Sequence, residues 1–455
     1  MEPQQSSAVG AADAVAVPRQ TLNIADAVAL IIGIVVGAGI FSAPSLVAAN
    51  AGSAGAIIAA WVVGGLISLT GAMCYAELAT TYPHPGGDYH YLKRAFGDTV
   101  GFLFAWVRLT VIPTGSIALL AFVFGDYATQ VVRLGELSSS IYAAGIVVML
   151  TALNVMGLRQ GKWTQNLLTL VEVAGILLII VAGLMFVAPE VSRAETAPSS
   201  GGAWGLVLVF VMLTYGGWNE AAYISAELRG PRHYIARALF LSIGVITALY
   251  VLVNLAYLNV LGVAGMSQSQ AVAADLMRSV GGERGAQIIS ALIAVSALTS
   301  ANATILMGAR TTYAFGRDFP LFSVLGRWNA SASTPVNALL AQGTIALLLV
   351  YLGTLTRQGF ATMVEYTAPV FWTFFLLTGI ALFVLRAREP HVQRPFKVPL
   401  YPLTPIIFCA TSSYLLYSSV MYTGIGALAG LAVLGAGFVV LLVNRMHTLA
   451  SAANR

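Results

Sequence analysis

Long apolar stretches alternate with short polar segments along most of the chain. A helix that crosses a lipid bilayer needs about 20 predominantly apolar residues. By that measure we expect twelve transmembrane helices, at approximately 24–48, 55–80, 98–130, 141–158, 164–188, 203–226, 236–262, 286–313, 335–354, 360–386, 402–421 and 424–444. Because the polar segments between them are mostly short, they favour one compact all-α bundle over separable domains.

Two of the connecting segments have patterns of their own. Tyr82 to Asp88 contains two prolines and two glycines, which forbid a continuous helix and predict a turn. Ser269 to Val280 has apolar residues at helical spacing with flanking polar residues. That spacing predicts a short interfacial helix on the outer face of the membrane.

The composition supports a multi-pass integral membrane protein. Of the 455 residues, 58% are hydrophobic and 9% are charged, and the mean hydropathy is +0.83. A soluble domain would have roughly 25% charged residues. The lipid bilayer is therefore the expected environment of this chain.

The positions of the basic residues predict the orientation. With the N-terminus inside, five basic residues fall outside and Arg108 lies within a span, so 17 of the 23 lie on the cytoplasmic side. Basic residues concentrate in cytoplasmic loops of membrane proteins. We expect both termini in the cytoplasm. Topology then accounts for the net charge of +5, and no nucleic acid partner is needed.

The ends of the chain are unlike the spans. Residues 1–20 are rich in alanine, serine and glutamine and lack the pattern of a secretory signal. We expect a disordered cytoplasmic tail at 1–20, a single transmembrane domain at 21–447 and a second cytoplasmic tail at 448–455. Cys74 and Cys409 lie within apolar runs, which is typical of small hydrophobic residues rather than of a disulfide.

Glycines interrupt the first apolar stretch at Gly37-Ala38-Gly39, and Pro44 follows a few residues later. Both residue types weaken a helix, and a helix that opens inside the membrane leaves N–H groups unpaired. Such N–H groups, together with the positive end of the next half-helix, suit a carboxylate. A different explanation stays open: small residues also permit close packing of membrane helices.

The sixth stretch is interrupted at Tyr215-Gly216-Gly217-Trp218-Asn219-Glu220. Two glycines cost a helix about 2 kcal/mol relative to alanine, and close packing explains this cluster poorly. Carbonyl groups released here can accept hydrogen bonds from an ammonium group. A molecule that carries a carboxylate and an ammonium on one carbon would bridge the two breaks.

Several segments resemble one family of transporters. They are Gly33 to Phe41, Tyr75 to Leu78 with Tyr82-Pro83 and Gly86-Gly87, Tyr215 to Asn219 with Glu227, Pro231 and Arg237, and Arg394 to Pro399. Together they resemble the amino acid, polyamine and organocation superfamily of secondary transporters, and most closely bacterial relatives of the L-type amino acid transporters. The likeness extends over roughly residues 20 to 400.

The resemblance implies a fold and a substrate site. The fold has two inverted repeats of five helices, at about 24–188 and 203–386, with helices 1 and 6 broken and two further helices at about 402–444. By position, backbone groups of Val35, Gly37, Ala38 and Gly39 would bind a carboxylate, and carbonyls near Leu213, Tyr215 and Gly216 would bind an amino group. Trp218 and Asn219 are further candidates for substrate contact, and Leu213 stands where several relatives have an aromatic gate.

Three ionisable residues lie inside predicted spans. Burying such a group in the membrane is energetically unfavourable, so its presence there suggests a function. Glu172 occupies the point in span 5 where many L-type relatives have a lysine, so a carboxylate that binds a proton or a cation becomes possible. Ser296, Thr299, Ser300 and Asn302 in span 8 are candidates to complete that ion site. Glu220 can favour a cationic substrate or carry a proton, and Arg108 is a candidate partner for either glutamate. A purely structural carboxylate stays an alternative for both.

Acidic residues near the cytoplasmic ends of spans, beside arginine and lysine, suggest an inner gate of ion pairs. They are Asp26, Glu77, Glu227 and Asp318. The absence of an external cysteine predicts that no covalently attached accessory subunit is present.

The remaining patterns narrow the function. There is no nucleotide-binding loop of the G-x-x-x-x-G-K-[ST] type, and the five histidines lack metal-ligand spacing. We therefore expect no cofactor, no metal and no catalytic residues, and a protein that is not an enzyme. The leading hypothesis is a secondary amino acid transporter of the cytoplasmic membrane, driven by proton symport or by exchange. A polyamine or cationic amino acid transporter is the nearest alternative, and a membrane-embedded amino acid sensor is a third.

Overall fold

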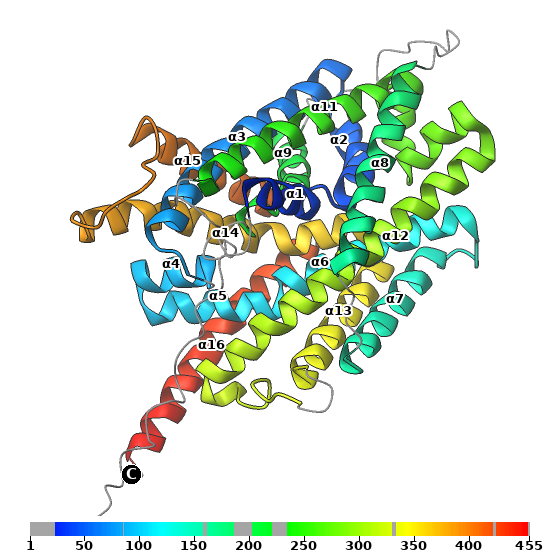
Figure 1. Ribbon diagram of the computed structural model, residues 1–455. Helices are drawn as coiled ribbons and strands as arrows, with labels where there is room; N and C mark the ends of the chain where they lie inside the picture. The colour runs from blue at the N-terminus through cyan, green and yellow to red at the C-terminus, as the bar shows by residue number, and fades with distance from the viewer. Residues whose placement is uncertain are drawn as a thin grey trace, which may run out of the picture.

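The computed structural model describes residues 23–84, 86–157, 162–185, 203–220, 234–329, 334–421 and 425–453 (Figure 1). Within these ranges the chain is helical and forms no strand beyond an isolated bridge between Asn329 and Thr334. The predicted all-α class is confirmed. The N-terminal tail predicted at 1–20 lies outside the described residues, and residues 448–453 continue the last helix.

The first half of the chain forms eight α-helices and one short 3₁₀ helix in its described residues. They are α1 (Ile24–Val35), η1 (Ala38–Phe41), α2 (Ala43–Ala51), α3 (Ala54–Thr81), α4 (Gly87–Phe96), α5 (Asp98–Thr110), α6 (Ile112–Val131), α7 (Ser138–Val155) and α8 (Lys162–Met185). The second half follows with α9 (Trp204–Thr214), η2 (Trp218–Glu220), α11 (Tyr234–Gln268), α12 (Val272–Asp318), η3 (Pro320–Phe322), α13 (Val336–Thr356), α14 (Gly359–Arg388), α15 (Leu403–Met421) and α16 (Ile425–Ala453).

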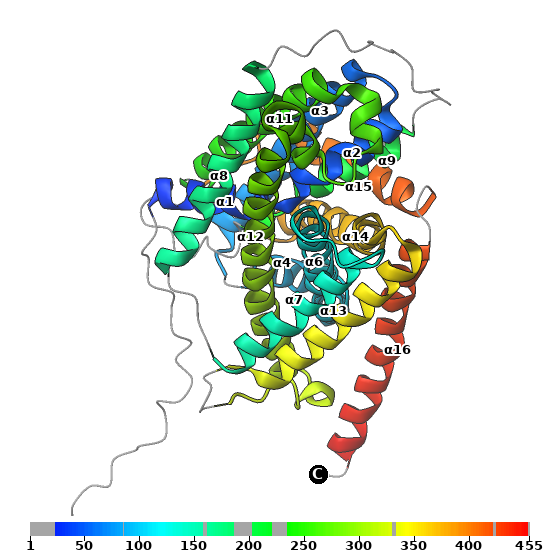
Figure 2. The same ribbon diagram turned by 90° about the vertical axis from the view of Figure 1, so that its right-hand side faces the viewer.

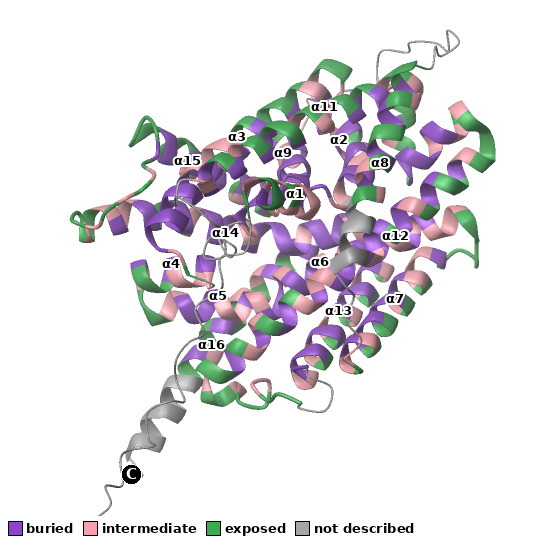
Figure 3. Cartoon of the chain, viewed as in Figure 1, coloured by how far each residue is buried: buried purple, intermediate pink, exposed green. Residues whose placement is uncertain are grey.

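Nine of the described helices are long and apolar enough to cross a membrane, and three shorter apolar helices accompany them at Ile24–Val35, Leu170–Met185 and Trp204–Thr214. The short ones coincide with predicted spans 1, 5 and 6. Many large apolar side chains, Leu66, Leu348 and Leu428 among them, are exposed, and Figure 3 shows exposed residues along the outward faces of the helices. An apolar exterior of this kind is the surface that lipid tails cover.

Three local details differ from the sequence prediction. The predicted turn ends early, because α4 already begins at Gly87. The predicted third span is divided at Val111, just before Pro113, where the missing N–H of proline interrupts helical pairing. The segment expected to be an interfacial helix is the first part of α12, which bends at Gly282 with φ 67° before it continues as the eighth span.

The bundle is built around α6, α11, α12 and α14. The helix α12 packs against α6, α8 and α13, while α11 packs against α1, α2, α3 and α8. The last helix, α16, contacts α5 and α14 and runs along the outside of the bundle (Figure 2). The short helices α1, α2 and α9 lie together beside α3 and α11 (Figure 1).

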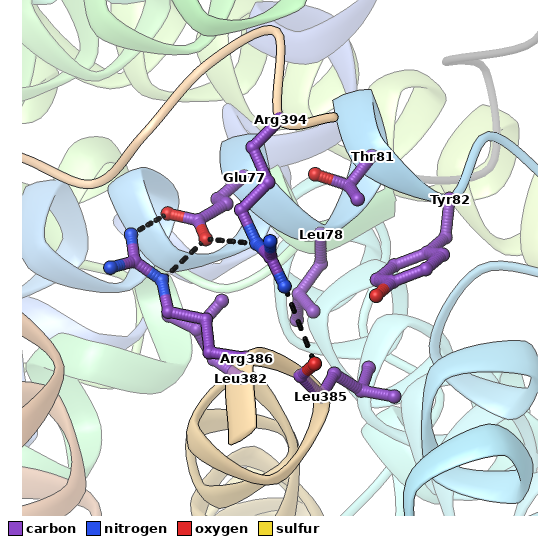
Figure 4. A pocket seen from close by; sticks show the side chains of 8 residues that line it. All are labelled: Glu77, Leu78, Thr81, Tyr82, Leu382, Leu385, Arg386 and Arg394. Carbon is purple, nitrogen blue, oxygen red and sulfur yellow. Dashed lines mark hydrogen bonds and ion pairs between the residues drawn. The ribbon is translucent and has the colours of Figure 1, made fainter. Parts of the chain in front are cut away.

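At one end of α3, Glu77 holds three separate segments together (Figure 4). Its carboxylate is 1% exposed and accepts hydrogen bonds from Nε and Nη2 of Arg386. It also forms an ion pair with Arg394, whose Nε lies 3.4 Å from Oε1. The backbone N–H of Val398 donates to the same carboxylate at 2.7 Å. Arg394 in turn donates to the carbonyl of Leu385 near the end of α14. Glu77 therefore ties α3 to α14 and to the segment that leads into α15.

Other members of the expected inner gate have different partners. Asp26 forms a capping box with Asn23 at the start of α1, and Asp318 lies 3.5 Å from the hydroxyl of Tyr89. Glu227 lies outside the described residues. A second ion pair joins Arg94 of α4 to Glu389 at 2.8 Å, and this guanidinium holds the pKa of Glu389 below its usual value. Both pairs link segments close to the ends of α3 and α14.

Replacing Glu77 by glutamine removes the carboxylate and leaves Arg386 and Arg394 without their shared counter-charge. Breaking a buried pair in this way is strongly destabilising, so we expect Glu77→Gln to lower the free energy of unfolding by about 3 kcal/mol. Thermal unfolding of the purified protein in detergent measures the change. Asp98→Asn is the control: its carboxylate is 81% exposed beside Lys93, and its loss should cost less than about 1 kcal/mol. Equal effects of the two substitutions would contradict the role of Glu77.

Candidate functional site

The first break follows directly from its glycines. The helix α1 ends at Val35, and the N–H of Gly37 turns back to the carbonyl of Val35 at 2.8 Å. Gly37 is extended, and η1 begins at Ala38 before α2 resumes at Ala43 with Pro44 in its first turn. Helical N–H groups at the start of a new helix have no partner in a preceding turn. Two helix starts, those of η1 and α2, therefore follow the end of α1 within eight residues.

The second break also lies at glycines, and its backbone turns more sharply. The helix α9 ends at Thr214, and the N–H groups of Tyr215 and Gly216 return to the carbonyls of Val211 and Leu213, each at 3.0 Å. Gly217 has φ 108°, a conformation that residues with a side chain rarely adopt. The 3₁₀ turn η2 follows, closed by the N–H of Glu220 on the carbonyl of Gly217 at 3.0 Å.

The two breaks lie directly against each other. A Cβ atom built on Gly217 would stand 3.0 Å from Cγ2 of Ile34 in α1. One built on Gly39 would lie 3.4 Å from Cγ2 of Thr214, the last residue of α9. The two breaks are therefore neighbours, and the approach is tight at Gly217, where an added Cβ would force Ile34 to move.

Tyr250 of α11 connects the breaks, and the sequence analysis missed it. Its hydroxyl is fully buried and lies 2.8 Å from the carbonyl oxygen of Val35 and 3.1 Å from that of Thr214. Those are the last carbonyls of α1 and α9. Trp61 and Tyr215 pack around the ring, with centroids 5.4 and 5.0 Å away. A tyrosine within an apolar stretch was the one available signal, and it does not reveal which carbonyls the hydroxyl meets.

The residues predicted to bind substrate fall into three groups. Val35, Gly37, Ala38 and Gly39 form the end of α1 and the start of η1. Leu213, Tyr215 and Gly216 form the end of α9, where the carbonyl of Leu213 already accepts the N–H of Gly216 and the hydroxyl of Tyr215 donates to the carbonyl of Trp61. Trp218 and Asn219 are buried in η2, and the Trp218 ring packs edge-on against Tyr75 at 5.2 Å.

Of the predicted ion-site residues, Glu172 and Ser296 are in contact. The Ser296 hydroxyl donates to Oε1 of Glu172 at 2.5 Å, and Glu172 is 7% exposed between α8 and α12. The hydroxyl of Thr299 donates to the carbonyl of Val295 in its own helix. Asn302 accepts from the amide of Asn154 in α7 at 2.7 Å. Ser300 lies half-buried on the same helix, where its carbonyl accepts from Thr304.

Glu220 pairs with Arg108, the partner that the sequence suggested for either glutamate. Nη1 of Arg108 lies 3.1 Å from Oε1 of Glu220, and the two side chains are 11% and 19% exposed. The pair joins α5 to the turn that follows the break in the sixth span. In lipid-like surroundings each partner would be costly alone. It therefore fixes η2 to the third span.

Comparison with known proteins bears on the whole chain. The family model described as amino acid permease matches residues 22–442. The chain is 30% identical to b(0,+)-type amino acid transporter 1 of Mus musculus over 416 residues, which cover 89% of this chain and 83% of the relative. It is 30% identical to large neutral amino acids transporter small subunit 2 of Homo sapiens over 431 residues, 92% of this chain and 79% of the relative.

Gly217→Ala tests the contact between the breaks. The added methyl group would lie 3.0 Å from Cγ2 of Ile34, and the alanine backbone would have to adopt φ 108°. We therefore expect the free energy of unfolding to fall by about 2 kcal/mol. Gly244→Ala in α11 is the matched control, because nothing lies within 4 Å of its Cβ position. That substitution should stabilise the helix by up to about 1 kcal/mol. Thermal unfolding in detergent that ranks the two variants the other way would contradict the contact.

Proposed function

The chain belongs to the amino acid permease family, and from that premise we propose that it is a secondary transporter that binds an amino acid at its two helix breaks. Family and relatives are transporters rather than enzymes. Movement of the substrate occurs by alternating access, in which the site opens to each side of the membrane in turn. The observation that carries this proposal is the close approach of the two breaks, where Gly39 lies beside Thr214 and Gly217 lies beside Ile34.

Backbone chemistry at the breaks matches the two groups that all amino acids share. The starts of η1 and α2 offer N–H groups and the positive end of a helix dipole, which favour a carboxylate. The end of α9 offers carbonyls of Leu213, Tyr215 and Gly216, which favour an ammonium group. A substrate without a carboxylate, such as a polyamine, would leave the N–H groups of the first break unused, and this favours an amino acid.

The proposed architecture has twelve spans, with inverted repeats at about 24–188 and 203–386 and two further helices at about 402–444. The nine long apolar helices and the three shorter ones coincide with those twelve segments in the described part of the chain, which supports it. We place both termini in the cytoplasm and the protein in the cytoplasmic membrane. The support is the charge pattern: 17 of 23 basic residues fall inside in that orientation.

Glu172 is the proposed site of coupling to a proton or another cation. Its buried carboxylate accepts a hydrogen bond from Ser296, which joins α8 to α12. A change in the charge of Glu172 would therefore alter the contact between these two helices. Proton symport and amino acid exchange are the two modes that this arrangement serves. Thr299, Ser300 and Asn302 stay candidates for a wider ion site around it.

We also propose that the chain needs no disulfide-linked accessory subunit. One set of relatives carries the name small subunit. In this chain, Cys74 is buried within α3 and Cys409 lies within α15, and both are unpaired. Neither position is an external loop, which is where a disulfide to a second protein would form.

Reconstitution in liposomes tests the function. We expect labelled neutral amino acids to enter liposomes containing the purified protein when a pH gradient or internal unlabelled amino acid is present. Liposomes without protein are the control, and a labelled polyamine tests the nearest alternative. If no amino acid moves under any gradient, transport is excluded; binding without flux would support a sensor instead.

Glu172→Gln separates coupling from exchange. Glutamine keeps the hydrogen bond to Ser296 but cannot ionise. We therefore expect the stimulation of uptake by a pH gradient to be at least about tenfold smaller in the variant than in the parent, which corresponds to about 1.4 kcal/mol of coupling. Exchange in the absence of a gradient should stay within about twofold of the parent. Glu283→Gln, an exposed carboxylate paired with Arg278, serves as the control. Unchanged gradient dependence in Glu172→Gln would remove this residue from coupling.

A further inference from the structure

A small cavity lies between η2, α3, α4, α5, α6 and α14, outside the residues proposed above to hold the substrate's carboxylate and amino groups. Its volume is about 20 Å³, enough for one group the size of a water molecule. The polar residues around it are Tyr75, Asp88, Arg108, Asn219, Glu220 and Thr378. Phenylalanines of α14, Phe371, Phe374 and Phe375, form the apolar wall.

The charges around the cavity are unequal. Arg108 is already paired with Glu220 at 3.1 Å, which leaves Asp88 as a second carboxylate beside one guanidinium. Asp88 is 4% exposed, and its Oδ1 atom has no hydrogen-bond partner among the described residues. Thr378, 1% exposed, also has a hydroxyl oxygen without a partner there. A buried polar atom left unpaired is unfavourable, so both oxygens favour a donor in the cavity.

Size and chemistry select the donor. A primary ammonium is similar in size to a water molecule and carries three N–H donors. It would add a positive charge beside Asp88 and Glu220, two carboxylates that have Arg108 near them. A guanidinium is larger, planar and forked, so it exceeds a cavity of about 20 Å³. The faces of the phenylalanine rings also attract a cation. These features fit the end of an unbranched aminoalkyl chain.

The wall of the cavity adjoins the second break, because Asn219 and Glu220 of η2 line it. Glu220, at its edge, closes the 3₁₀ turn on the carbonyl of Gly217 at 3.0 Å. Tyr75, on its wall, packs edge-on against Trp218 at 5.2 Å. Residues two and three positions after Gly217 therefore line the cavity, which places it beside an amino acid held at the break.

We propose that this cavity is a subsite for the side-chain ammonium of a diamino acid such as lysine or ornithine, with Asp88 as counter-charge and Thr378 as a second acceptor. The inference rests on the proposed function, because it assumes that the amino acid backbone is held at the helix breaks. Asp88 is then a specificity-determining residue: it distinguishes lysine from leucine, and the size of the cavity distinguishes lysine from arginine.

Protonation of Asp88 would weaken the subsite. Burial raises the pKa of Asp88 to about 7, while hydrogen bonds from Tyr75 and Asn219 and the charge of Arg108 lower it. The other titratable groups facing it are Glu220 of η2, which raises its pKa, and Tyr91 of α4; α14 contributes none in the cavity. As the pH falls through about 7, Asp88 loses its charge, so affinity for lysine should fall while affinity for leucine stays constant.

The test compares uptake of labelled lysine, ornithine, arginine and leucine into liposomes containing the parent protein, Asp88→Asn or Thr378→Val. We expect the parent to take up lysine and ornithine with a lower KM than arginine. Asp88→Asn should raise the KM for lysine roughly 10- to 100-fold, as expected for the loss of a hydrogen bond to a charged group. The KM for leucine should stay within about twofold. Thr378→Val, which leaves the carboxylate in place, should raise the KM for lysine roughly 3- to 10-fold.

The pH profile and a control variant complete the design. The KM for lysine should rise between pH 8 and pH 6 in the parent and stay flat in Asp88→Asn. Asp126→Asn, which changes a carboxylate bonded to Ser139 at the far end of α6, should behave as the parent. Binding of labelled lysine to the detergent-solubilised parent and Thr378→Val gives a second measurement that needs no flux and no folded Asp88 variant.

The outcomes separate this inference from the proposed function. Uptake of leucine without uptake or binding of lysine overturns the subsite and leaves the transporter intact. Equal losses for lysine and leucine in Asp88→Asn also overturn it. If Asp88→Asn abolishes the response to a pH gradient but keeps the affinity for lysine, the cavity holds a proton instead. Failure of every amino acid to bind or move rejects the proposed function itself.

Discussion

The structure depends on one constraint: main-chain N–H and C=O groups cannot stay unpaired inside an apolar bundle. Two spans open their helices in the middle, and each opening frees groups that cost several kcal/mol apiece in lipid. The openings face each other, with Gly217 against Ile34 and Gly39 against Thr214. The hydroxyl of Tyr250 lies within hydrogen-bond distance of the last carbonyl of α1 and the last carbonyl of α9.

Charged groups obey the same constraint by another route. Glu77 has two guanidinium groups and a backbone N–H as partners. Arg108 and Glu220 form an ion pair between α5 and η2. Glu172 accepts a hydrogen bond from Ser296, its one hydrogen-bond partner among the described residues. The more partners a buried charge has, the more costly it is to move that charge or change its protonation. Glu220 and Glu172 are therefore better suited than Glu77 to the changing contacts of the proposed transport cycle.

Local chemistry made part of this predictable from the sequence. The breaks were found because glycine pairs and a nearby proline weaken a helix wherever they occur, and the apolar lengths gave the helical class. The bridging role of Tyr250 and the bond between Asn154 and Asn302 were not found, because each depends on a partner far away in the sequence. The same reason explains why Glu172 could be singled out but its neighbour Ser296 could only be offered among four candidates. The helix α4 was missed because the prolines and glycines before it mask its start.

A site made from backbone groups has a limit that follows from its chemistry. In the proposed site, N–H and carbonyl groups at the breaks would bind the carboxylate and ammonium that every amino acid carries, so they would not distinguish one side chain from another. Discrimination must come from side chains one turn farther on, where η2 directs Asn219 and Glu220 toward the cavity that contains Asp88. Gly217 joins the two regions, since its backbone contacts the first break on one side and accepts the bond that closes η2 on the other. In the proposed mechanism, a substrate that changed the geometry of the break would also move Glu220, and with it the pairing of Arg108. Selection of the side chain and movement of the third and sixth spans would then be parts of one physical event.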